Sequence, residues 1–276
     1  MSNPAAPAEQ LLELAAEYRR HNDALMGLWE TIAEAPTVCA EKAEHARRLA
    51  VSAARVIHMI EDEHPRNTRP IQVVRARAAH LRQLALDAAH HLDDASTILA
   101  AASSETRIRG RDMSPALRQA LERARNHIDL AKALTTLGPS DCVATAEIYV
   151  TERRRTGIFP LHRPPALSPS QDAALRAVAR GQVATHDSST DYDGTEIPER
   201  AIGLEGARVT ITTIRSLESR GLVTRAPSSL MYHDSHVFLT PDGRRGLAAS
   251  FGLSRPPATT PARPAPRPTT TRSTTR

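Results

Sequence analysis

The sequence predicts a mainly α-helical protein in which long amphipathic helices precede a small α+β domain. Over most of the first 138 residues, apolar side chains recur every three or four positions, as they do in helices that bury one face. From residue 166 onward, short helical patterns alternate with strand-like segments and turn signals. A chain of 276 residues is long enough for two domains of ordinary size.

The helical region is expected to span residues 8–138 and carries four apolar stripes. The first is a heptad seam that begins at Leu11, and Pro36 is expected to end its helix. The third stripe, from Ile71 to Ala102, is the most regular. We expect an antiparallel helical bundle or coiled coil. Such seams can be filled within one chain or by a second copy, and a homodimer through these N-terminal helices is the expected assembly.

Cap and turn residues predict where these helices begin and end. Thr37 is the expected N-cap of the second helix, and Ser114, which precedes a proline, is the expected N-cap of the fourth. Gly138–Pro139 is expected to end the fourth helix, and a fifth is expected over residues 140–155. Residues 139–165 therefore form a helix followed by a proline-rich interdomain linker.

Residues 166–254 change in character. Ser168 or Ser170 can cap a short helix that Gly181 ends, and Thr210 can cap another that Gly221 closes. Two strand patterns follow, and a final helix starts at Thr240. The segments TTIRSLESRGLVTR and VFLTPDGRRGLAA resemble the recognition helix, hairpin and following helix of bacterial winged helix-turn-helix regulators such as the MarR-like group. The resemblance covers roughly a third of the chain, and the full expected fold is a helical bundle, a winged-helix domain and a disordered tail.

This resemblance implies DNA binding, with the recognition helix in the major groove and the wing beside the backbone. Arg215 would contact a guanine edge, while hydroxyl groups and Arg220 or Arg225 would contact phosphates. The implied DNA-binding residues are Thr210, Thr212, Thr213, Arg215, Ser216, Ser219, Arg220 and Arg225. Because no nucleotide-binding loop or catalytic constellation occurs in the sequence, we expect a non-enzymatic regulator or mobile-element accessory factor without a cofactor.

One segment departs from the family pattern. Where a second helix is expected, residues 182–207 read QVATHDSSTDYDGTEIPERAIGLEGA, which is rich in acidic residues. We interpret this segment as a strand hairpin in which residues 182–188 pair with residues near 201–209. An acidic hairpin facing the groove would repel DNA. The alternative function is therefore a protein-interaction scaffold whose winged-helix module serves as an adaptor for a protein partner.

The net charge of +5 is distributed unevenly along the chain. It is 0 for residues 1–140, +1 for 141–165, −1 for 166–254 and +5 for 255–276. The last segment contains almost only Arg, Pro, Thr and Ala, so it is predicted to be a disordered tail. Its five arginines either add salt-sensitive attraction to nucleic acid or serve as a solubilising end.

The 12 histidines raise the question of a metal site. Glu61 with His64, and Asp87 with His90, have the i, i+3 spacing of carboxylate-bridged di-iron helix bundles. Asp87 and His90 lie off the apolar stripe, however, and His64 stands beside a proline at a helix end, so no metal site is expected. The polar run of His90, His91, Asp93 and Asp94 is expected to form surface pairs within one helix.

Cysteine usage and the N-terminal sequence bear on the cellular compartment. Cys39 and Cys142 are far apart and fit neither a disulfide scaffold nor a zinc-finger spacing. The N-terminus lacks a signal-peptide pattern, and no apolar run approaches the roughly 18 residues of a membrane span. We therefore expect a cytoplasmic protein that does not contact a membrane.

Overall fold

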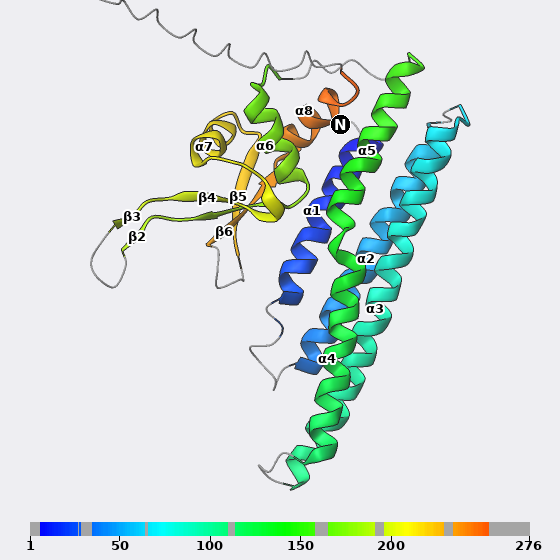
Figure 1. Cartoon of the computed structure of the whole chain (residues 1–276). Helices are drawn as coiled ribbons and strands as arrows, with labels where there is room; N and C mark the ends of the chain where they lie inside the picture. The colour runs from blue at the N-terminus through cyan, green and yellow to red at the C-terminus, as the bar shows by residue number, and fades with distance from the viewer. Residues whose placement is uncertain are drawn as a thin grey trace, which may run out of the picture.

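The computed structural model is mainly helical and carries a small antiparallel sheet near its C-terminal end (Figure 1). It describes residues 6–26, 28, 35–63, 66–109, 114–157, 165–190, 196–228 and 234–253. The predicted tail at 255–276 lies outside this range, and so does most of the predicted proline-rich linker.

Long helices form the N-terminal region. They are α1 (Pro7–Met26), α2 (Ala35–Asp62), α3 (Arg69–Arg109), α4 (Pro115–Thr136) and α5 (Gly138–Arg155). α2 and α3 form an antiparallel pair, and α4 packs along α3 (Figure 1). α1 packs mainly against α5, with further contacts to α2.

Three helix boundaries differ from the sequence-based prediction. α1 ends at Met26, before Pro36, and Pro36 lies in the first turn of α2. α2 begins at Ala35, so Thr37 lies in its first turn and is not its N-cap. Gly138 and Pro139 do not simply end a helix, because they form the first turn of α5, where a proline needs no N–H partner. α4 and α5 therefore follow one another as two nearly collinear helices (Figure 1). Gly138 is needed at the contact with α1, since a Cβ there would lie 2.5 Å from Cδ1 of Tyr18.

The most regular of the predicted apolar stripes is filled within one chain. Every residue of the most regular stripe is buried: Ile71, Val74, Ala78, Leu81, Ala85, Ala88, Leu92, Ala95, Leu99 and Ala102. α3, which carries them, packs against α2, α4 and α5. None of the helices in the described part of the chain combines the length and apolar content that crossing a membrane requires.

Both cysteines belong to the core. Cys39 and Cys142 are free and buried. Burial raises the pKa of Cys39 to about 11 and raises the pKa of Cys142 well above its usual value. Because the thiolate is the reactive form of cysteine, both side chains are unreactive packing residues in the folded protein.

The C-terminal module comprises the described residues between 165 and 253. Its helices are α6 (Pro169–Ala179), α7 (Ile211–Ser219) and α8 (Pro241–Ser250). The four-stranded sheet has the order β4-β1-β6-β5, with every pair antiparallel. These strands are β1 (Val183–His186), β4 (Arg200–Gly203), β5 (Val223–Pro227) and β6 (Ser235–Leu239). A second pair, β2 (Ser189–Thr190) and β3 (Glu196–Ile197), extends away from the body of the module (Figure 1).

The predicted strand pairing of the acidic segment is confirmed, although the strands are shorter than expected. Val183 pairs with Gly203, and His186 pairs with Arg200. Residues 196–210 are all described, and they form β3, β4 and the 3-10 turn η2 (Leu204–Gly206), with no α-helix before α7. The described residues of this segment therefore form paired strands, where the winged-helix resemblance implies a helix.

Predicted caps and turn glycines position the three helices of the module. Ser168 caps α6, Thr210 caps α7 and Thr240 caps α8, each through its side-chain oxygen. Gly181 and Gly221 follow the ends of α6 and α7 with φ of 71° and 67°, a conformation that glycine adopts without strain.

α1 lies between the other long helices and the module (Figure 1). One cluster of buried residues includes Leu14 and Tyr18 of α1, Val150 of α5, and Leu175 and Phe251 of the module. The hydrophobic core is therefore continuous from the helical region into the module.

A buried polar network also joins α1 to the sheet. Asp23 Oδ2 lies 3.2 Å from His236 Nε2, and Arg19 Nε lies 3.1 Å from Asp23 Oδ1. His236, only 3% exposed, also lies 3.0 Å from the Ser228 hydroxyl. Burial raises the pKa of Asp23 to about 6, and Arg19 opposes part of that rise. These contacts hold the module, and with it α7, against the helical region.

Candidate nucleic-acid interface

α7 presents one apolar and one polar face. Ile214 and Leu217 are buried against the rest of the module. Thr212, Arg215 and Ser219 are exposed, and their spacing of three and four residues places them on one side of the helix. These three of the eight residues implied by the winged-helix resemblance therefore share an outward face.

Four others make contacts that hold α7 in place. The hydroxyl of Thr210 accepts a hydrogen bond from the Thr213 backbone N–H, and the two hydroxyl oxygens lie 2.9 Å apart. Ser216 accepts a hydrogen bond of 2.9 Å from Gln171 Nε2 of α6. Arg220 donates to Gln171 Oε1 at 3.3 Å. These polar groups cap α7 and attach it to α6.

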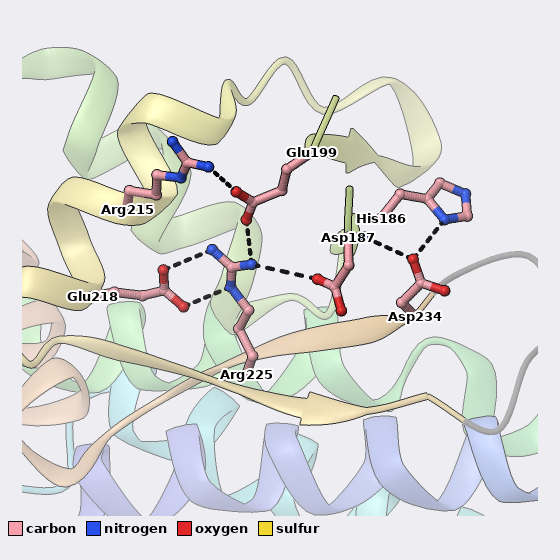
Figure 2. A network of polar contacts seen from close by, with 7 residues as sticks. All are labelled: His186, Asp187, Glu199, Arg215, Glu218, Arg225 and Asp234. Atoms are coloured by element: carbon pink, nitrogen blue, oxygen red, sulfur yellow. Dashed lines mark hydrogen bonds and ion pairs between the residues drawn. The ribbon is translucent and has the colours of Figure 1, made fainter. Parts of the chain in front are cut away.

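Arg225, on β5, is surrounded by carboxylates. It donates to both oxygens of Glu218, at 2.6 and 2.8 Å, and to Glu199 (Figure 2). Asp187 Oδ1 lies 3.8 Å from its Nη1. The hydrogen bonds to Glu218 are the main cause of a raised Arg225 pKa. This arginine is committed to ion pairs inside the module, a placement that differs from the phosphate contact implied by the resemblance.

Glu199 lies between the two arginines that the sequence singled out. It precedes β4 and accepts hydrogen bonds from Arg225 and from Arg215 (Figure 2). These bonds lower the pKa of its carboxyl group, so Glu199 is ionised at neutral pH. Its side chain is 14% exposed, whereas that of Arg215 is 63% exposed. Arg215 therefore reaches solvent while one of its donors is held by a carboxylate.

Sequence reasoning missed the position of Glu199. Glu199 was part of a visibly acidic segment, but it is 16 residues from Arg215 and 26 from Arg225. Only the β1–β4 pairing and the placement of α7 bring the three together. Asp234 fixes the same hairpin from the other side, since it accepts the backbone N–H of Asp187 at 2.7 Å and lies 3.1 Å from His186 Nδ1.

Of the two metal-ligand pairs considered from sequence, the one formed by Glu61 and His64 cannot be placed, because His64 lies outside the described residues. In the other pair, Asp87 accepts a hydrogen bond from Gln83. In the part of the chain that the structure describes, a different group brings its metal-ligating atoms within 4.8 Å of one another: His91, Asp94 and His127.

Comparison of the chain with protein-family models, with curated proteins and with solved structures finds no match. A functional assignment therefore depends on the geometry of α7 and on the charges that surround it.

Proposed function

We propose that this chain is a non-enzymatic DNA-binding protein, a transcriptional regulator or mobile-element accessory factor, that uses α7 as the recognition helix of a winged helix. The observation that carries the proposal is the placement of α7 against α6, directly before the antiparallel pair of β5 and β6. In this interpretation β5 and β6 form the wing, and β1 completes the sheet behind it.

The outward face of α7 has suitable chemistry. A guanidinium such as that of Arg215 can donate two hydrogen bonds to the O6 and N7 atoms of guanine. A hydroxyl group such as that of Thr212 can donate to a phosphate oxygen. The Ser219 hydroxyl donates to the Ser216 carbonyl oxygen at 3.0 Å, and it would exchange that bond for one to a phosphate. α7 is a regular helix of nine residues, and the diameter of an α-helix with its side chains, about 10–12 Å, suits a major groove about 12 Å wide.

The proposal includes a homodimer and a cytoplasmic location. A second copy would present a second α7 to a half-site about one duplex turn away. Because the regular stripe of α3 is filled within one chain, the contact between copies would use another surface of the helical region.

A fluorescence anisotropy titration with duplexes from the chain's genomic neighbourhood tests this function. The full-length protein is expected to bind saturably and to lose affinity as salt rises, because binding releases counterions from phosphates. Arg215→Ala is expected to weaken binding about fivefold, which corresponds to roughly 1 kcal/mol.

Arg77→Ala is the matched control, because Arg77 is an exposed arginine of α3, away from the module. Its affinity is expected to equal that of the unmodified protein. Absence of saturable binding, or equal affinities for the Arg215 and Arg77 variants, would contradict the proposal. The protein-to-duplex ratio at saturation reports whether one or two copies bind.

A second candidate function is a protein-interaction scaffold in which the module is an adaptor. The pairing of Arg215 and Arg225 with Glu199 favours it, because phosphates would have to compete with that carboxylate. The adaptor function predicts no salt-sensitive DNA binding by the unmodified protein. It predicts none by a Glu199→Gln variant either, and this second result separates the two candidates.

A further inference from the structure

Two histidines from neighbouring helices face each other near the middle of α3 and α4. Nδ1 of His91 lies 3.2 Å from Nδ1 of His127, and the ring centroids are 5.4 Å apart. Oδ2 of Asp94, one helical turn after His91, lies 3.6 Å from the same His127 nitrogen. Two imidazole nitrogens and a carboxylate oxygen therefore converge on one small volume.

We propose that His91, Asp94 and His127 form a binding site for Zn²⁺ or a chemically similar divalent transition-metal cation. In a tetrahedral zinc site with Zn–N bonds of about 2.0–2.1 Å, two ligand nitrogens lie about 3.3–3.4 Å apart. The two nitrogens of His91 and His127 are 3.2 Å apart, close to this value, and Asp94 Oδ2 lies 3.6 Å from the His127 nitrogen. The ligand atoms of all three residues lie within 4.8 Å of one another. A cation can therefore bond all three groups after small side-chain movements.

The donor set matches this class of metal. Neutral imidazoles and a carboxylate are common zinc ligands, and the carboxylate supplies one negative charge toward the divalent cation. Without a metal, one of the facing Nδ1 atoms must carry a hydrogen and donate it to the other. A cation takes the place of that hydrogen and bonds both lone pairs.

Packing positions the two helices before any metal binds. Leu92 follows His91, Ile128 follows His127, and both are buried in one core cluster of α2, α3 and α4 residues. Supported ligands of this kind lose little freedom on binding, which favours affinity. The three side chains are themselves partly exposed, so the site is open to solvent and leaves a fourth position for water. Bound metal would link α3 to α4.

Cobalt spectroscopy on the full-length protein, prepared without a polyhistidine tag, tests the site. Co²⁺ is expected to bind with one equivalent per chain and to produce the visible absorption bands of a four-coordinate complex. Zn²⁺ is expected to displace it and to raise the Tm by mass action. His91→Ala and His127→Ala are expected to abolish both effects.

His58→Ala is the matched control. His58 is an exposed histidine of α2 whose Nδ1 lies 3.6 Å from a carboxylate oxygen of Glu61. This variant is expected to keep full binding. Asp94→Asn preserves the shape of the side chain but removes its negative charge. It is expected to weaken metal binding by about tenfold or more, because even the loss of a residue that only hydrogen-bonds to a ligand weakens metal binding by at least that factor.

Melting curves in chelator establish that each variant is folded. Wild-type protein that gives no cobalt bands and no zinc-dependent rise in Tm would overturn the proposal. Folded His91 and His127 variants that bind as well as the His58 variant would overturn it too, and the two histidines would then share only a hydrogen bond.

Discussion

Replacing Gly243 with alanine is expected to lower the free energy of unfolding by about 3 kcal/mol, because overpacking a tight contact forces the backbone to move. A Cβ at this position would lie 1.9 Å from the carbonyl oxygen of Leu222. That oxygen belongs to the backbone and already accepts a hydrogen bond from the Thr240 N–H at 3.1 Å. α8 would have to move away from the start of β5 and withdraw the buried Leu247 from the core.

The sign of this change separates packing from helix propensity. Alanine is a better helix former than glycine by about 1 kcal/mol, so propensity alone predicts stabilisation. Urea denaturation monitored by circular dichroism measures the change. Asp242→Ala is the control, because Asp242 lies in the same turn, is 74% exposed and forms a surface ion pair with Arg245. Its expected cost is about 0.5 kcal/mol, and an equal cost for both variants would contradict the packing argument.

Replacing Glu199 with glutamine is expected to strengthen DNA binding about tenfold at low salt. The change removes a negative charge beside the outward face of α7 and releases Arg215, and partly Arg225, from their shared carboxylate. One further phosphate neutralised makes the slope of log affinity against log salt more negative by about one unit. Anisotropy titrations over a series of salt concentrations measure both quantities.

Glu196→Gln provides a charge-matched control. Glu196 is exposed on β3 of the same hairpin, so its removal changes the net charge equally without releasing Arg215. Its effect is expected to stay below about twofold, because exposed charges are screened over distances near 10 Å. If both variants bind DNA equally tightly, Glu199 does not restrain the recognition face.

Local sequence signals predicted the module's helices well. Ser168, Thr210 and Thr240 each form a cap within their own few residues, and Gly181 and Gly221 end helices through their own backbone conformation. The apolar stripe of α3 could also be predicted from the sequence, because apolar residues at a period of three to four define one buried helix face.

Features that depend on distant contacts could not be predicted in the same way. A Gly-Pro pair such as Gly138–Pro139 can end one helix or begin another. Here it begins α5, and Gly138 packs against Tyr18 of α1, a contact that the local sequence does not reveal. The facing of His91 and His127, 36 residues apart, depends on the register between α3 and α4. Periodicity gives each helix a buried face without fixing this register.

Site-specific crosslinking of Thr212→Cys to DNA tests most directly whether α7 lies in the groove. Cys39 and Cys142 are buried, so the new cysteine supplies an exposed thiol among protected ones. We predict thiol–disulfide exchange with a duplex that carries a tethered, activated disulfide, so that the new cysteine becomes linked to the DNA and a small thiol is released. This reaction is expected to be far faster than for Val51→Cys on the exposed side of α2, and untethered competitor duplex is expected to suppress it. Equal crosslinking by the two variants, or crosslinking that competitor duplex does not reduce, would contradict a DNA-reading role for α7.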